Sequence, residues 1–152
     1  MITMKLKRRD QENMKILIDT NVILDCLMNR QDYVDNATKI FKLCETKKVK
    51  GYISALSIPN IIYILRKELD NFKIKKIIDT LSLIFEIIEL SSEDLKNACL
   101  LNFNDYEDAI QSIHARKSKS NFIVTRNDKD FSNSTTPAIM PEKFLELIES
   151  IF

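Results

Sequence analysis

The chain has 152 residues, with 23 Lys and Arg against 22 Asp and Glu, and a formal net charge of +1. This balance excludes a globally basic nucleic-acid-binding protein, and no apolar run approaches the ~20 residues of a membrane span. The three cysteines are odd in number and scattered, which indicates reduced thiols rather than a disulfide framework. Because the N-terminus also lacks an apolar signal-peptide core, we expect a cytoplasmic protein that does not bind membranes.

Short apolar strands alternate with amphipathic helices from residue 14 onward, whereas residues 1–13 are polar and predict a flexible N-terminal extension. The predicted strands are residues 16–18, 50–54, 85–90, 122–124 and 138–140. The predicted helices are residues 22–28, 33–47, 55–69, 72–83, 92–102, 104–117 and 141–151. This alternation predicts that residues 14–152 form a single-domain α/β/α sandwich with a central parallel sheet of four or five strands.

The most informative stretch is the run that ends the first strand. Ile16, Leu17 and Ile18 have no polar alternation, which is typical of a strand buried on both faces. Asp19 follows where ligands bind in open α/β sheets, and a buried carboxylate there needs a cation or hydrogen bonds to meet it. An alternative is that Asp19 or Thr20 merely caps the next helix.

Other acids and amides follow strands, or stand in the first turn of helices, at the same predicted carboxyl edge of the sheet. Asp105 and Asp108 share the first turn of a helix, and Asp130 lies one turn after the strand at 122–124. Carboxylates that converge in one crevice repel each other, and Mg²⁺ or Mn²⁺, which prefer oxygen ligands, would relieve that repulsion. The alternatives are ordinary helix-terminus acids, with Asn104 as the cap and Glu107 completing a capping box, and a simple loop acid at Asp130.

Three blocks carry a resemblance: IDTNV at residues 18–22, DYEDAIQ at 105–111 and IVTRNDKDF at 123–131. In this order and spacing they resemble the signature blocks of the PIN domain family, over a stretch from Met14 to nearly the C-terminus. The resemblance implies a metal-dependent ribonuclease that uses Mg²⁺ or Mn²⁺. It most often means the toxin of a bacterial toxin–antitoxin pair of the VapC-like kind.

The resemblance assigns roles to individual residues. Asp19, Asp108 and Asp130 match the family's acids and are the expected metal ligands. Asn21 and Thr125 match polar positions that support the acid cluster.

Two positions depart from the family pattern. The glutamate that family members commonly carry after the second strand is here Asn60, and the usual acid after Thr-Arg is Asn127. An amide can ligate through its carbonyl but adds no charge, so metal affinity should be weaker unless Asp105 compensates. The predicted catalytic group is therefore Asp19, Asp105, Asp108 and Asp130, with Asn60 and Asn127 as supporting polar residues.

Two further side chains are candidates for a functional role, Arg126 and His114. Arg126 stands beside the predicted site and is expected to contact phosphate. His114, the only histidine, lies well along its helix and off the face of Asp108, so we expect a partly exposed structural histidine rather than a general base.

Three functional hypotheses follow. The leading one is an Mg²⁺- or Mn²⁺-dependent endoribonuclease whose partners are RNA, an antitoxin and a second copy of the chain, bound through residues 58–69 and 72–83. The second, motivated by Asn60 and Asn127, is a non-catalytic PIN-fold module that binds RNA or protein. The third is a haloacid-dehalogenase-like phosphotransferase with Asp19 as nucleophile, ranked last because Asp19-Thr20-Asn21 lacks that class's second aspartate.

Overall fold

The computed structural model describes residues 13–151 and is built around one parallel sheet. Its strands are β1 (Lys15–Ile18), β2 (Lys50–Ser54), β3 (Glu86–Ile88), β4 (Phe122–Val124) and β5 (Ala138–Ile139). They lie in the order β3-β2-β1-β4-β5, and every neighbouring pair is parallel. The predicted parallel sheet is thus confirmed with five strands, and β1 lies at its centre.

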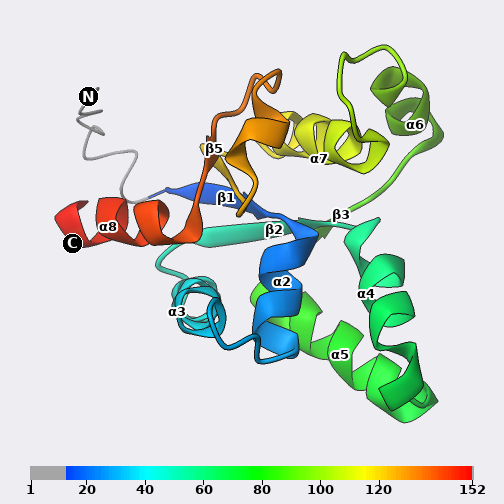
Figure 1. Ribbon diagram of the computed structural model, residues 1–152, viewed down its shortest axis with the longest axis vertical. Coiled ribbons are helices and arrows are strands. Elements are labelled where there is room, and N and C mark those ends of the chain that lie inside the picture. Colours follow the sequence, from blue (N-terminus) through cyan, green and yellow to red (C-terminus); the bar gives the residue numbers. More distant parts are fainter. Residues whose placement is uncertain (1–12, 152) are drawn as a thin grey trace.

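Helices cover both faces of the sheet (Figure 1). The α-helices are α2 (Thr20–Leu27), α3 (Val34–Glu45), α4 (Ser57–Leu65), α5 (Asn71–Ile84), α6 (Ser92–Ala98), α7 (Tyr106–Lys117) and α8 (Pro141–Ile151). Two 3₁₀ turns, η1 (Arg66–Glu68) and η2 (Asp128–Phe131), complete the described elements. Helices α6 and α7 lie over one face, and α2, α3, α5 and α8 pack against the other.

Alternation along β1 explains why both faces are covered. Ile16 and Ile18 point into the larger core with α2, α3 and α8, whereas Leu17 points into the core beneath α7. All three side chains are fully buried. Asp19 comes next and emerges at the carboxyl edge of the sheet, as the sequence predicted.

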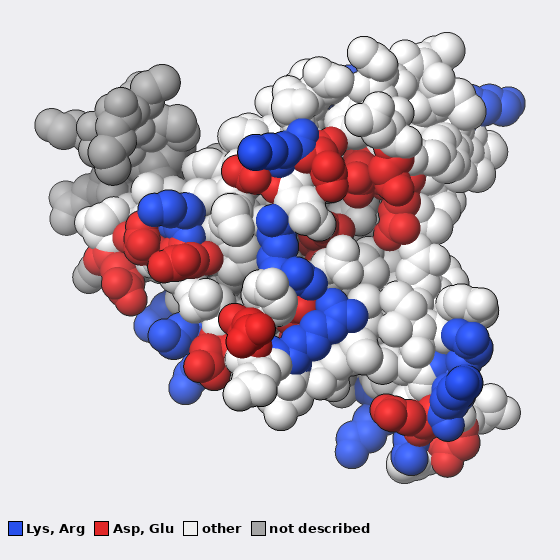
Figure 2. All heavy atoms as spheres, viewed as in Figure 1, with Lys and Arg blue, Asp and Glu red and all other residues white. Residues whose placement is uncertain are grey.

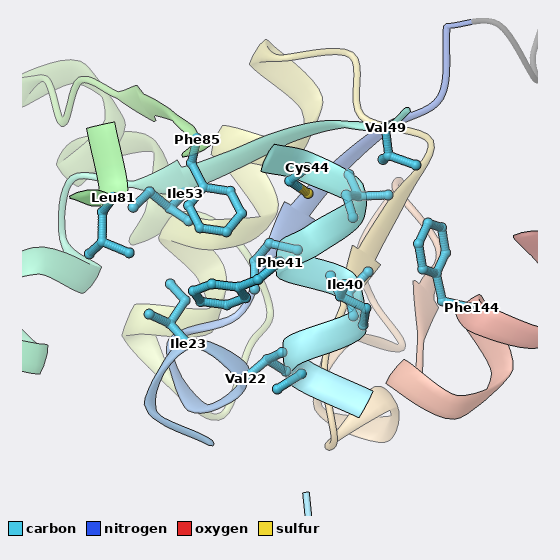
Figure 3. Packing of buried hydrophobic residues seen from close by; sticks show 14 of the residues in the cluster. Val22, Ile23, Ile40, Phe41, Cys44, Val49, Ile53, Leu81, Phe85 and Phe144 are labelled. Atoms are coloured by element: carbon cyan, nitrogen blue, oxygen red, sulfur yellow. The ribbon is translucent and has the colours of Figure 1, made fainter. Parts of the chain in front are cut away.

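In the larger core, Phe41, Cys44 and Phe85 lie close together (Figure 3). Phe41 and Phe85 meet edge to face with ring centroids 5.0 Å apart. A Cβ on Gly51 would lie 2.6 Å from Phe85 Cδ1 and 2.7 Å from Cys44 Sγ, so a larger residue would force this packing apart. Burial raises the pKa of the Cys44 thiol to about 12, as expected for an inert core cysteine.

Several helix ends differ from the predictions by one turn or less. The helix predicted at 55–69 is α4 followed by η1, and Ser57 lies inside α4 rather than capping it. A complete capping box, absent from the prediction, joins Ser91 and Asp94 at the start of α6. The predicted cap at Asn104 is wrong, because the side chain of Asp105 accepts from the Asp108 amide instead.

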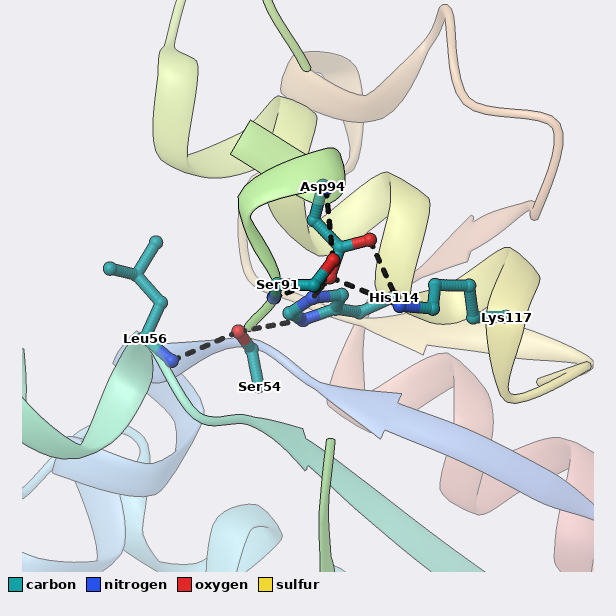
Figure 4. Close-up of polar contacts among 6 residues, drawn as sticks. All are labelled: Ser54, Leu56, Ser91, Asp94, His114 and Lys117. Carbon is teal, nitrogen blue, oxygen red and sulfur yellow. Dashed lines mark hydrogen bonds and ion pairs between the residues drawn. The ribbon is translucent and has the colours of Figure 1, made fainter. Parts of the chain in front are cut away.

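His114 is fully buried, so the prediction of a partly exposed histidine is wrong, although its structural role holds. Its Nδ1 lies 2.9 Å from Ser54 Oγ, and its Nε2 lies 3.0 Å from Asp94 Oδ2 (Figure 4). Lys117 Nζ donates to the same carboxylate at 2.9 and 3.1 Å. The resemblance to a Ser-His-Asp triad is only geometric, because Ser54 is wholly inaccessible. The network ties α7 to β2 and α6.

No helix within residues 13–151 is long and apolar enough to cross a membrane. The predicted N-terminal extension, residues 1–13, lies outside the described residues except for Asn13. A single domain over 14–152 stays a prediction.

Candidate active site

The separate segments singled out in the sequence meet in one cleft at the carboxyl edge of the sheet. The cleft has a volume of about 330 Å³. Its polar lining residues include Asp19, Thr20, Asn21, Asn60, Asp105, Glu107, Asp108, Asn127 and Asp130. Figure 2 shows acidic side chains gathered on this part of the surface, near the start of α7. The structure thus brings together all four predicted catalytic acids and three of the four supporting polar residues; Thr125 lies behind the cleft wall.

Asp19 is held from behind by two neutral donors. Gln111 Nε2 donates to Oδ1 at 3.0 Å, and Thr125 Oγ1 donates to Oδ2 at 2.8 Å. Burial raises the pKa of Asp19, and these hydrogen bonds to the carboxylate oppose the rise. Asp19 occupies the N-cap position of α2, but its side chain makes no capping hydrogen bond there, so capping does not explain the hydrogen bonds from Gln111 and Thr125.

Asp108 carries the strongest signal of crowded charge. Burial, together with the charges of Asp105, Asp19, Asp130 and Glu107, raises its pKa to about 7. Such a shift is common in active-site carboxyls and uncommon in exposed helix-terminus acids. Asp105 has two roles. It lines the cleft, and its carboxylate caps α7 by accepting a hydrogen bond from the Asp108 amide at 3.0 Å.

Two residues of α7 were missed as site residues by the sequence analysis. Gln111 orients Asp19, and Glu107 Oε1 accepts from Thr20 Oγ1 at 3.1 Å. Thr20 also lies 2.7 Å from Ser57 Oγ, which links α2, α4 and α7. The available signal was helical spacing, because Glu107 and Gln111 are four residues apart on one face and Asp108 precedes Gln111 by three.

The donor chemistry of the cleft fits a hard divalent cation. Asp19, Asp108 and Asp130 all line the cleft, and burial with the neighbouring acids raises the pKa of Asp108, so a divalent cation would relieve the repulsion between these carboxylates. The buried Gln111 Oε1 accepts no hydrogen bond from the described residues. Within residues 13–151, no three acids, histidines or cysteines lie close enough together to hold an ion as they stand.

Arg126 has a protein partner outside the cleft. Its Nε lies 2.8 Å from Asp25 Oδ2, its Nη2 donates to Asp25 Oδ1 at 3.1 Å, and its guanidinium stacks 4.0 Å from the Tyr33 ring centroid. Asp25 is buried and also accepts from Arg30. The Arg126 guanidinium is therefore engaged by Asp25 and Tyr33, and its contact with phosphate stays a prediction.

Comparison with known proteins identifies the family. The family model described as PIN domain matches residues 15–129. The chain belongs to the PIN domain family. This confirms the resemblance seen in the three sequence blocks and removes the haloacid-dehalogenase-like alternative.

Relatives of this PIN domain cover nearly all of it. Ribonuclease VapC1 of Aquifex aeolicus (strain VF5) is 28% identical over 137 residues, which is 87% of this chain and 94% of that protein. A toxin-antitoxin complex from Klebsiella pneumoniae aligns with a TM-score of 0.62 and 21% identity, over 83% of this chain and 97% of that one. VapBC2 from Rickettsia felis, bound to a promoter DNA fragment, aligns with a TM-score of 0.60 and 17% identity, over 82% and 96%. The structural matches establish the fold.

Proposed function

We propose that this PIN domain is an Mg²⁺- or Mn²⁺-dependent endoribonuclease and the toxin of a toxin–antitoxin pair. The observation that carries the nuclease proposal is the convergence of Asp19, Asp108 and Asp130, from three separate segments, on one cleft where the pKa of Asp108 rises to about 7. A cluster of uncompensated acids costs stability, and a bound cation offsets that cost. The similarity to Ribonuclease VapC1 supports RNA as the substrate.

Asp19, Asp108 and Asp130 are the proposed ligands. A bound divalent cation supplies Lewis acidity and a more acidic water for in-line hydrolysis of a phosphodiester. The chain's own residues prepare the site: Thr125 and Gln111 fix both oxygens of Asp19 before anything binds. Burial and the neighbouring acids raise the pKa of Asp108 to about 7, so this carboxyl binds a proton more readily than an ordinary aspartate does in the metal-free protein.

Asn60 and Asn127 keep oxygen donors in the cleft lining but add no negative charge. We infer that cation affinity is lower than an all-acid cleft would give, with Asp105 and Glu107 supplying part of the missing charge. The same two amides favour the second candidate, a PIN-fold module that binds RNA or protein without cutting it.

The toxin part of the proposal is supported by the toxin-antitoxin complexes among the structural matches. A homodimer through residues 58–69 and 72–83 is part of the same proposal. It is supported by Phe72 and Leu83, which are 76% and 77% exposed on α5.

The deciding experiment is cleavage of a labelled single-stranded RNA by highly purified protein in Mn²⁺, Mg²⁺ or EDTA. We expect cleavage with either cation and none in EDTA, and loss of cleavage in Asp19→Asn and Asp130→Asn. Asp128→Asn is the matched control, because Asp128 is exposed, lies two residues from Asp130 and does not line the cleft. Metal-independent cutting would refute the cation dependence. RNA binding without cutting at any cation concentration would refute the nuclease and leave the binding module.

A further inference from the structure

Helix α4 presents one face to the core and another to the acidic cleft. Ile61 and Leu65, four residues apart, are buried in the larger core. Asn60, Tyr63 and Ile64 have the spacing of a second helical face, and all three line the cleft. An aromatic side chain is therefore placed at the wall of the proposed catalytic cleft rather than elsewhere on the surface.

Tyr63 is not held in place by core packing. Tyr63 lines the cleft, yet the residue is 65% exposed. The guanidinium of Arg66 lies 4.0 Å from the centroid of its ring, and Arg66 Nη1 donates to the Tyr63 carbonyl at 2.7 Å. One face of the ring is thus backed by a fixed cation, and the exposed remainder is available to a flat ligand.

The charge of the cleft explains why such a platform would be useful. Asp19, Asp105, Glu107, Asp108 and Asp130 all line it, so electrostatics alone repel a phosphate backbone. Figure 2 shows acidic side chains gathered near the start of α7, and α4, which also lines the cleft, contains no charged residue. Stacking against an aromatic ring attracts any base, because every base has a π-face and none needs a positive patch to bind.

We propose that Tyr63 is a nucleobase-stacking platform that holds a base of single-stranded RNA beside the acidic cleft, with Arg66 behind the ring. This inference rests on the proposed ribonuclease function and describes how the cleft binds its RNA substrate. Bases in a duplex already stack on their neighbours, so the platform selects unpaired strands. An alternative occupant is a protein surface, since exposed aromatic residues also mark protein interfaces. Tyr63 lines the cleft that is proposed to cut RNA, and this favours RNA as the occupant.

Four substitutions of Tyr63 separate stacking from simple apolar contact. Tyr63→Phe and Tyr63→Trp keep a stacking ring, Tyr63→Leu keeps only apolar bulk, and Tyr63→Ala keeps neither. The chain contains no tryptophan, so Trp in Tyr63→Trp is the only indole and reports on contact directly. Leu100→Ala is the control, because Leu100 is an apolar residue that is 83% exposed but does not line the cleft.

Binding is measured in EDTA by the anisotropy of a short fluorescein-labelled single-stranded RNA and of its duplex form, and by quenching of the indole emission. We expect Tyr63→Ala and Tyr63→Leu to bind the single strand about 5- to 150-fold more weakly, the range for one lost base–aromatic stack. Tyr63→Phe, Tyr63→Trp and Leu100→Ala should bind as the parent does. The indole emission should be quenched by the single strand and not by the duplex.

Cleavage of the same RNA by the parent in Mn²⁺ separates the two proposals. If the parent cuts RNA but Tyr63→Ala and Tyr63→Leu bind it unchanged, the platform is wrong and the nuclease stands. If the parent neither binds nor cuts RNA, both proposals fail. Should Tyr63→Ala leave RNA binding unchanged and instead lower the mass measured by light scattering, Tyr63 is a contact between copies of the chain, which also overturns the platform.

Discussion

Thr125 Oγ1 donates a 2.8 Å hydrogen bond to Asp19 Oδ2, and this contact joins the ends of two neighbouring strands 106 residues apart in the sequence. The sheet register explains it. Ile18 of β1 pairs with Val124 of β4, and the Asp19 amide donates to the Val124 carbonyl at 3.0 Å. The next residue on each strand therefore meets the other at the carboxyl edge, which orients the Asp19 carboxylate before any ligand binds.

Thr125→Val should weaken cation binding without unfolding the protein. Valine keeps the shape of threonine but cannot donate, so the pKa of Asp19 should rise further and the fold should lose about 1–3 kcal/mol. The measurement is the rise in melting temperature on adding Mn²⁺, which should shrink in Thr125→Val and persist in Thr125→Ser. A parent-like Mn²⁺ response in Thr125→Val would show that this bond does not prepare Asp19.

Arg126→Gln should lower stability. Asp25 is 1% exposed and accepts from both Arg126 and Arg30, so removing one donor leaves a buried carboxylate with half its partners. We expect a loss of about 1–3 kcal/mol in urea unfolding. If stability is unchanged and the salt dependence of RNA binding flattens by about one unit of slope, Arg126 contacts phosphate instead.

Local pattern was sufficient to predict the elements and the family. The bounds of β2, β4 and α8 agree with the predicted residues 50–54, 122–124 and 141–151, because each is an apolar or amphipathic run closed by polar residues or proline. Caps were less predictable. Asn104 and Asp105 are both good N-caps, and only the path of the chain into α7 decides between them.

Pairings between distant residues could not be predicted from local pattern. The bond from Gln111 to Asp19 spans 92 residues, and the pair Arg126–Asp25 spans 101. Each depends on strand order and on which side of a helix faces the sheet. The sequence therefore located four of the five acids that line the cleft, but not Glu107, the Gln111 amide that orients Asp19 or the Asp25 carboxylate that engages Arg126.

His114→Phe should destabilise the protein without changing its response to Mn²⁺. His114 is fully buried between Ser54 and Asp94, so the substitution leaves both partners short of a bond and should cost about 2–4 kcal/mol. The control is the Mn²⁺-induced rise in melting temperature. A lost Mn²⁺ response in a folded His114→Phe protein would mean that this network supports the acidic cleft.

The same network predicts how stability responds to acid. Burial lowers the pKa of His114 below 6.5, against the opposing effect of Asp94. The unfolded chain then binds the proton more readily than the folded one, so this contribution is present above pH 6.5 and is lost as pH falls below it. The slope of unfolding free energy against pH in this range should be smaller in His114→Phe.

Asp108→Asn should abolish RNA cleavage and leave the metal-free protein as stable as the parent or more so. Burial and four neighbouring acids raise the pKa of Asp108 to about 7. The contribution of this proton to folding stability is therefore complete below the unfolded-state pKa of 3.8 and is lost as pH rises through 7. In EDTA the parent should therefore melt lower at pH 8 than at pH 6, relative to the mutant, because asparagine removes the ionising charge. The Asp108 amide still donates to the Asp105 cap in the mutant, so α7 keeps its N-terminus.

Added Mn²⁺ should raise the melting temperature of the parent by mass action and hardly that of the mutant. A mutant that still cuts RNA, or that loses several kcal/mol of stability in EDTA as a disrupted core would, would show that Asp108 is a structural residue and that the cleft is not a metal site.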